Sequence, residues 1–190
     1  GPDTATKEQL RANAPLADRL RPRHLGEVIG QDHVLGPDGA LARMVASGRL
    51  SSIILWGPPG TGKTSIARLL AEAVDLHYMA VSAVFSGVAD LKKAFAEAEK
   101  VAAMGRGTLL FVDEIHRFNR AQQDGFLPFV EQGLVTLVGA TTENPSFEIN
   151  AALLSRCQVL VLNRLDEAAL GELLTRAEAL EDRALPLTDD

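Results

Sequence analysis

The sequence predicts an α/β fold in which one five-stranded parallel sheet lies between two layers of helices. Two observations support this prediction. Short apolar runs alternate with segments of helical periodicity along the chain, which is typical of βαβ units with right-handed crossovers. In addition, the pattern GPPGTGKT, from Gly57 to Thr64, lies between an apolar run and a helical segment. Strand, glycine-rich loop and helix in this order form a P-loop, so we expect a three-layer αβα nucleotide-binding fold.

Five strands are expected where apolar residues follow one another over strand length, as they do in a parallel sheet covered on both faces. They are residues 51–56, 77–81, 108–112, 134–140 and 158–162. The first strand leads directly into the glycine-rich loop, and the third (TLLFV) is almost entirely apolar. We expect the third strand to lie beside the first.

Helices are expected where apolar residues recur at helical spacing. They are residues 40–47, 63–74, 88–104, 119–131, 149–154 and 167–181. Gly48, Gly105 and Gly133 come just after three of these segments, which is where glycine commonly ends a helix. Pro128 lies inside the segment 119–131, so we expect an irregularity in that helix.

The composition is that of an ordinary folded protein, with 190 residues of which 46% are hydrophobic and 23% charged. No apolar run approaches the roughly 18 residues of a membrane-spanning helix, so we expect no membrane partner. The formal net charge of −6 gives no global basic field, and any DNA contact must be local. The densest basic stretch, residues 19–24, is a candidate contact or a solvated surface segment. The single cysteine, Cys157, excludes an internal disulfide and suits a reducing cytoplasm.

Three regions are expected along the chain. Residues 1–14 begin with Gly1-Pro2, which resembles the scar of a protease-cleaved tag, and continue as a polar, aperiodic leader that we expect to be flexible. Residues 15–164 hold the five strands and form the nucleotide-binding core. Residues 165–190 contain the last helical pattern and are expected to be the start of a truncated helical lid.

The glycine-rich loop predicts a site for ATP or ADP with Mg²⁺. Its glycines let the backbone curl so that N–H groups and the N-terminus of the next helix point at phosphate oxygens. Lys63 is expected to reach the β- and γ-phosphates, and the Thr64 hydroxyl to bind Mg²⁺. The residues predicted to bind nucleotide here are Gly57, Pro58, Pro59, Gly60, Thr61, Gly62, Lys63, Thr64 and Ser65.

The third strand ends in two adjacent carboxylates, Asp113 and Glu114, which is the Walker B arrangement. With this strand beside the first, Asp113 is expected to point toward the Mg²⁺ that Thr64 holds. Glu114 is one position further, where a carboxylate can orient or deprotonate an attacking water. Such a pair after a strand is weak evidence alone, but its place about fifty residues after a P-loop favours the hydrolytic interpretation.

Four further residues allow two interpretations each, with His116 and Arg117 considered together. Asn144 follows the fourth strand, where its amide could hold the attacking water or the γ-phosphate, or serve a turn before Pro145. Arg156 could pair with a local carboxylate, or project to a neighbouring subunit as an arginine finger that stabilises charge in phosphoryl transfer. His116 and Arg117 could relay the nucleotide state to DNA or a neighbour, or lie in a solvated loop.

Taken together, GPPGTGKT, LLFVDEIHRFN, GATTENPSFE and SRC resemble the AAA+ ATPase core, and more narrowly its clamp-loader branch. Within that branch, DEIHRFNRAQQDGFLPFVEQG and TTENPSFEINAALLSRC are similar to the replication-associated recombination protein A family, also called RarA or MgsA. The resemblance covers residues 15–181. The P-loop would fit many ATPases, whereas these two longer stretches are specific.

The resemblance implies roles position by position. Lys63 and Thr64 match the Walker A lysine and hydroxyl, Asp113 and Glu114 the Walker B pair, Asn144 sensor 1, and Arg156 the finger that acts in trans. Relatives wrap the adenine with a segment matched by Leu16, Arg21, Pro22, Ile29 and Gly30. Ser82 falls where relatives have a polar residue that restrains the catalytic glutamate.

The family acts on DNA at stalled or gapped replication forks, so the resemblance implies DNA and single-stranded-DNA-binding protein as partners and a cytoplasmic, nucleoid-associated location. It also implies a homo-oligomer in the full-length protein. Because the lid and the oligomerisation region are incomplete here, we expect this fragment to be a monomer with weak ATPase activity. A sliding-clamp loader subunit or a branch-migration motor would share these motifs, and a non-hydrolysing nucleotide-switched scaffold is the alternative of another class.

Overall fold

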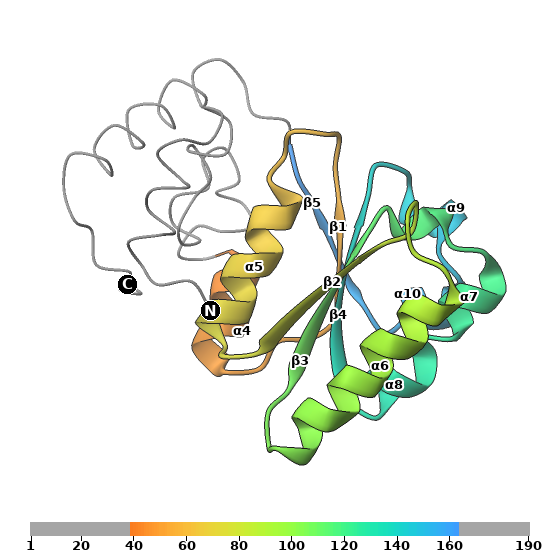
Figure 1. The fold of residues 1–190 in the computed structure, drawn as a ribbon. Coiled ribbons are helices and arrows are strands. Elements are labelled where there is room, and N and C mark those ends of the chain that lie inside the picture. Colours follow the sequence, from red (N-terminus) through yellow and green to blue (C-terminus); the bar gives the residue numbers. More distant parts are fainter. Residues whose placement is uncertain (1–38, 164–190) are drawn as a thin grey trace, which may run out of the picture.

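The computed structural model describes residues 39–163, which form one five-stranded sheet with helices on both faces (Figure 1). The strands are β1 (Ile53–Trp56), β2 (His77–Ser82), β3 (Thr108–Asp113), β4 (Val135–Thr141) and β5 (Gln158–Val161). Every pairing between them is parallel. The predicted α/β class is therefore confirmed, and each predicted strand lies within two residues of its observed bounds. The predictions for residues 1–38 and 164–190, the lid helix at 167–181 among them, lie outside the described residues.

The order of the strands in the sheet is β2-β3-β4-β1-β5, which corrects one prediction. We expected the third strand beside the first, but β4 lies between them and pairs with both. The chain leaves β1, crosses two strand positions to form β2 at the sheet edge, and then adds β3 and β4 back toward β1. Strands covered on both faces have similar apolar sequences, so their order could not be predicted from the pattern.

Two layers of helices cover the sheet. The helices are α4 (Ala40–Ser47), α5 (Lys63–Ala73), α6 (Val88–Ala103), α7 (Arg120–Asp124), α8 (Leu127–Glu131), α9 (Pro145–Glu148) and α10 (Ala151–Leu154), with a 3₁₀ turn η2 (Ile115–Arg117). Figure 1 shows α5 on one side of the sheet and α6 on the other. Ile53 and Leu55 of β1 pack with α4 and α5, whereas Ile54 packs with α6 and α8. This alternation is that of a strand buried on both faces.

The segment 119–131 forms two short helices where we predicted one. Asn119 caps α7, because its Oδ1 accepts from the Gln122 N–H at 2.8 Å while Gln122 Oε1 accepts from the Asn119 N–H at 2.9 Å. Pro128 lies in the first turn of α8, where a missing N–H costs little, so it helps to begin a helix and does not interrupt one. The turns η2 and α9 were not predicted, because three or four residues are too few to show helical periodicity.

A buried glutamine joins this segment to the chain that follows β4. Gln123 is 2% exposed, and its Nε2 donates to the carbonyls of Phe118 and Glu148, both at 3.0 Å. Its Oε1 accepts from the Asn150 N–H at 2.7 Å. A buried polar group is stable only when such partners are present, so Gln123 fixes α7 against the turn that leads into α10.

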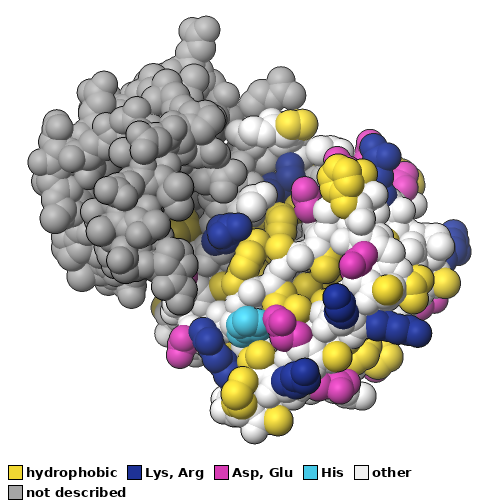
Figure 2. Space-filling model, in the orientation of Figure 1, with side chains coloured by type: hydrophobic (Ala, Val, Ile, Leu, Met, Phe, Trp, Pro, Cys, Tyr) yellow, Lys and Arg dark blue, Asp and Glu magenta, His cyan; other side chains and the backbone are white. Residues whose placement is uncertain are grey.

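The surface is mixed in charge. On the face that Figure 2 shows, Lys and Arg side chains alternate with Asp and Glu side chains over the described residues. Within residues 39–163, no helix is long and apolar enough to cross a membrane.

Aromatic packing under α6 and α8 provides a test of the core. Phe126 is fully buried, with its ring 5.7 Å from that of Phe95 and 5.8 Å from that of Phe118. We predict that Phe126→Ala lowers the free energy of unfolding by about 3–5 kcal/mol, because it removes contacts and leaves a cavity. Phe85, which is 88% exposed, is the matched control, and Phe85→Ala should change this free energy by less than about 0.5 kcal/mol. Urea unfolding of both variants measures the difference, and equal effects would contradict the described core.

Candidate nucleotide-binding site

The glycine-rich loop joins the end of β1 to the start of α5, as the sequence predicts. Gly60 and Gly62 have φ angles of +85° and +86°, a left-handed conformation that side chains with a Cβ rarely adopt. Gly62 is also the N-cap of α5, so the loop turns directly into the helix. The N-terminus of α5, with its free N–H groups, therefore faces the space enclosed by the loop.

Lys63 and Thr61 hold the loop from inside. The Thr61 hydroxyl, which is buried, donates to the Pro58 carbonyl at 3.0 Å. Lys63 Nζ donates to the carbonyls of Gly57 and Pro58, at 2.5 Å and 3.0 Å. The ammonium group thus lies within the loop that the sequence assigns to phosphate binding.

Burial lowers the pKa of Lys63 below its ordinary value of 10.5, while the negative charges of Asp113 and, to a smaller extent, Glu114 act to raise it. Asp113, at the end of β3, lines the same pocket as the loop, so the end of β3 lies near it. Walker A and Walker B residues are therefore brought together across β4.

One pocket contains the loop and Asp113 together. It is lined by residues 59–65 and by the Asp113 side chain from the end of β3. Thr64 and Asp113 supply the hydroxyl and carboxylate oxygens that Mg²⁺ prefers. Among the described residues no group of three or more His, Cys, Asp or Glu side chains could hold a metal by itself.

Glu114 has an unusual backbone and a cationic partner. Its φ and ψ are 52° and 47°, the left-handed region, which costs a non-glycine residue about 1–2 kcal/mol. Its Oε2 lies 3.2 Å from Nε of Arg117, three residues along in η2. Arg117 therefore contacts the candidate catalytic carboxylate, an interaction that neither of the two sequence-based interpretations of this loop included.

Thr141 is a site residue that sequence reasoning missed. It is the last residue of β4 and is 1% exposed. Its carbonyl accepts from the Gly57 N–H at 3.1 Å, and its Oγ1 lies 2.8 Å from Nδ1 of His116. Thr141 thereby connects the start of the P-loop to the residues after Asp113. A buried polar residue at the carboxyl end of a mainly apolar strand was the available signal.

Asn144 and Ser82 lie at the same edge of the sheet. Asn144 is the N-cap of α9, and its Oδ1 accepts from the Ser146 N–H at 3.0 Å, so the turn interpretation describes its contacts here. Its role toward phosphate or water stays a prediction. Ser82 is the register partner of Asp113, and its Oγ accepts from the Val84 N–H at 3.3 Å. The carboxylate that it was expected to restrain contacts Arg117 in this structure.

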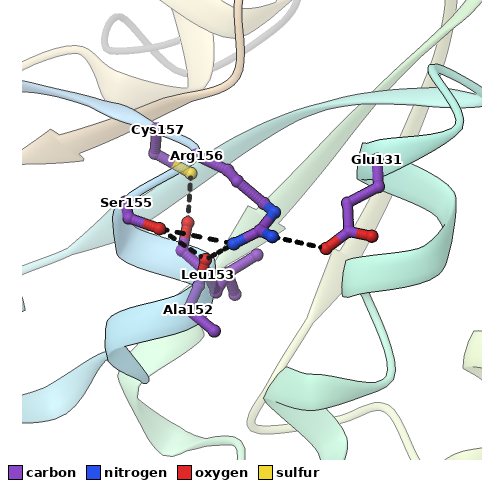
Figure 3. Close-up of polar contacts among 6 residues, drawn as sticks. All are labelled: Glu131, Ala152, Leu153, Ser155, Arg156 and Cys157. Atoms are coloured by element: carbon purple, nitrogen blue, oxygen red, sulfur yellow. Dashed lines mark hydrogen bonds and ion pairs between the residues drawn. The ribbon is translucent and has the colours of Figure 1, made fainter.

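Arg156 pairs with a carboxylate of its own chain (Figure 3). Its Nη2 lies 2.7 Å from Oε1 of Glu131, at the end of α8, and its Nη1 donates to the Ala152 carbonyl at 2.6 Å. The first interpretation of this residue, a local ion pair, is observed, and its role in trans stays a prediction. The residues expected to wrap the adenine, which are Leu16, Arg21, Pro22, Ile29 and Gly30, lie outside the described residues.

Residues 53–165 match the family model described as "ATPase family associated with various cellular activities (AAA)". The chain belongs to the AAA family of ATPases. The matched range begins with β1 and includes the P-loop, Asp113, Glu114, Asn144 and Arg156. The sequence-based prediction of an AAA-type ATPase core is therefore confirmed.

Several curated relatives of this AAA chain carry the name replication-associated recombination protein A. That of Coxiella burnetii is 52% identical over 171 residues, which are 90% of this chain and 38% of the relative. That of Escherichia coli K12 is 49% identical over 169 residues, which are 89% of this chain and 37% of the relative. The predicted similarity to this family is confirmed, and the chain spans less than two fifths of the length of these relatives.

Among solved structures, this AAA chain is similar to the RuvB Holliday junction branch migration motor of Thermotoga maritima. The TM-score is 0.67 at 31% sequence identity, over 89% of this chain and 57% of RuvB. This similarity agrees with the parallel sheet and helical layers described above.

Burial raises the pKa of the Cys157 thiol to about 11, and its Sγ donates to the Leu153 carbonyl at 3.3 Å. Only the thiolate is alkylated readily, so we predict that iodoacetamide modifies Cys157 at pH 8 about 200 times more slowly than a free thiol of pKa near 8.5. The rate should rise about tenfold per pH unit until pH approaches 11. Because the chain has one cysteine, mass spectrometry reads this reaction directly. The urea-unfolded chain is the control, and equal rates in the two states at pH 8 would contradict the prediction.

Proposed function

We propose that this chain is the ATP-hydrolysing core of a protein that acts on DNA at stalled or gapped replication forks. The observation that carries the hydrolytic part is the single pocket that contains both the P-loop and Asp113. The replication part is supported by relatives at 49–52% identity that are named replication-associated recombination protein A. Both parts of the proposal concern a longer protein, because the chain spans 37–38% of the length of those relatives.

Binding of the nucleotide is assigned to the loop and its helix. Backbone N–H groups of residues 60–65 and the N-terminus of α5 bind phosphate oxygens, and the Lys63 ammonium offsets their charge. Thr64 and Asp113 are the residues that would hold Mg²⁺, which when bound neutralises charge that develops on the phosphates. Lys63 already lies among carbonyl oxygens, so it exchanges these acceptors for phosphate oxygens on binding.

Hydrolysis is assigned to Glu114. A water oxygen forms a bond to the γ-phosphorus while the bond from this phosphorus to the β–γ bridging oxygen breaks, giving ADP and inorganic phosphate. The Glu114 carboxylate accepts the proton that the water loses. The left-handed backbone of Glu114 supports this role. Strained backbone of this kind is often found at catalytic positions.

Two further residues complete the proposed site. Asn144, three residues after β4, orients the attacking water or the γ-phosphate. Arg156 acts in trans, stabilising negative charge on the nucleotide of a neighbouring subunit. The proposal therefore includes a homo-oligomer of the full-length protein, DNA and single-stranded-DNA-binding protein as partners, and a cytoplasmic, nucleoid-associated location. The adenine segment of residues 16–30 and the lid of residues 165–190 belong to the same proposal.

A branch-migration motor is the second candidate, supported by the similarity to RuvB at a TM-score of 0.67. The higher identity to the replication-associated recombination proteins, 49–52% against 31%, favours the first candidate. A nucleotide-switched scaffold that does not hydrolyse ATP is disfavoured, because it has no need of a carboxylate held at the position of Glu114.

We predict that Glu114→Gln in the full-length protein binds ATP with wild-type affinity but hydrolyses it about 10²–10⁴ times more slowly, because the amide cannot accept the proton. Isothermal titration calorimetry with ATP measures the affinity, and a phosphate-release assay measures the rate of hydrolysis. Glu143→Gln, which changes an exposed carboxylate after β4, is the control and should leave both unchanged. Wild-type turnover in Glu114→Gln would defeat the assignment of Glu114 and favour the scaffold.

The DNA part is tested by the ATPase rate of the full-length protein with forked, gapped, four-way-junction and fully duplex DNA at one stated salt concentration. Stating the salt is necessary because phosphate contacts make DNA affinity strongly salt-dependent. We predict stimulation of several-fold by forked or gapped DNA and little by blunt duplex. Preferential stimulation by the four-way junction would favour the branch-migration motor. No stimulation by any DNA would reject the fork proposal while leaving the ATPase assignment intact.

A further inference from the structure

Glu131 and Arg156 connect two elements that are far apart in sequence. Glu131 is the last residue of α8, and Arg156 follows α10 just before β5. The Nη2 atom of Arg156 lies 2.7 Å from Oε1 of Glu131, a distance typical of a charge-assisted hydrogen bond (Figure 3). The candidate arginine finger, Arg156, is therefore held by a carboxylate at the end of α8.

The chain around Arg156 is fixed by its own side chains. Arg156 Nη1 and Ser155 Oγ both donate to the Ala152 carbonyl, at 2.6 Å and 2.9 Å, and Cys157 Sγ donates to the Leu153 carbonyl. The last carbonyls of a helix have no partner within it, and Arg156 and Ser155 satisfy that of Ala152, while the Leu153 carbonyl also accepts from the Arg156 N–H at 3.1 Å. The guanidinium is thus held on one side by α10 and on another by Glu131 (Figure 3).

The pair is held but not enclosed. The Arg156 side chain is 40% exposed and that of Glu131 48% exposed. An incoming anion can therefore reach the guanidinium without unfolding anything around it. A solvent-exposed ion pair is also weak, so phosphate oxygens with more charge can compete with or share the arginine.

We propose that Glu131 is the positioning residue for Arg156. Its carboxylate holds the guanidinium in the orientation in which it meets the phosphate oxygens of a nucleotide bound by a second copy of this chain. An arginine has many rotamers, and fixing one of them before the subunits meet removes part of the entropic cost of the contact. This inference rests on the proposed role of Arg156 in trans and adds a second residue to it.

The test compares Glu131→Ala with Glu131→Gln in the full-length protein by steady-state ATPase kinetics. Glu131→Ala should lower kcat about three- to tenfold with KM for ATP and the Kd for ADP unchanged, because Arg156 is proposed to stabilise charge that develops in the transition state and not to bind the nucleotide. Glu131→Gln should recover most of the loss, because its Oε1 still accepts from Nη2. A general loss of folding would instead alter nucleotide binding and would not be rescued by glutamine.

Glu97→Ala is the matched control. Glu97 is also half-exposed, at 53%, and its Oε2 lies 2.8 Å from Nε2 of His77. The substitution Glu97→Ala removes a surface carboxylate and its ion pair on α6, away from Arg156. It should leave kcat unchanged. A fall in kcat equal to that of Glu131→Ala would overturn the inference, because the effect would then follow from any lost surface carboxylate.

Arg156→Ala and the double variant Glu131→Ala/Arg156→Ala distinguish the proposed role of Arg156 in trans from the positioning role of Glu131. If Arg156→Ala keeps the wild-type rate, the proposed role in trans is wrong. If Arg156→Ala is slow and the double variant is equally slow, Glu131 acts through Arg156, as proposed. If Arg156→Ala is slow but Glu131→Ala turns over at the wild-type rate or faster, only the positioning role is overturned, and a faster rate would mean that Glu131 restrains the finger.

Discussion

The pairing of β4 with both β1 and β3 is the constraint on which the nucleotide site depends. β1 leads into the P-loop and β3 ends in Asp113. β4 is the one strand that lies between them. With about 4.8 Å between neighbouring strands, the two segments start about 10 Å apart. This distance leaves room between the lysine of one segment and the carboxylates of the other, and the pocket lined by residues 59–65 and Asp113 lies there.

The central position of β4 also explains why residues without a chemical role, such as Gly139, affect the geometry of the site. A Cβ at Gly139 would lie 2.9 Å from Cδ1 of Ile54 and 3.1 Å from Cδ1 of Ile115. A larger residue at this position would displace the side chains of Ile54 and Ile115, and Ile115 begins η2, the turn that presents Arg117 to Glu114. At the end of the same strand, Thr141 bonds to the P-loop through its carbonyl and to His116 through its hydroxyl. Packing in the middle of β4 and hydrogen bonding at its end therefore set the relative position of the P-loop and the residues after Asp113.

The sequence predicted those parts of the site that depend on local pattern. The P-loop and all five strands have strong signals within a few residues of chain, whereas the carboxylates after β3 were interpreted from their spacing after the P-loop. Strand order was predicted wrongly, because it depends on which crossovers pack best and not on the composition of any strand. The contacts Arg117 to Glu114, His116 to Thr141 and Glu131 to Arg156 were not predicted as pairs. The last two join residues 25 positions apart, and nothing in either local pattern marks its partner.

The site divides into a buried frame and exposed charges, and the division has an energetic reason. The apolar residues of β1, β3 and β4 are buried on both faces of the sheet, so moving these strands would cost several kcal/mol per exposed side chain. By contrast, the pairs of Glu114 with Arg117 and of Arg156 with Glu131 have side chains that are 34–59% exposed. Pairs of this kind contribute about 0–1 kcal/mol each. The charged groups proposed to act on phosphate can therefore change partners at little cost, while the frame that positions them stays fixed.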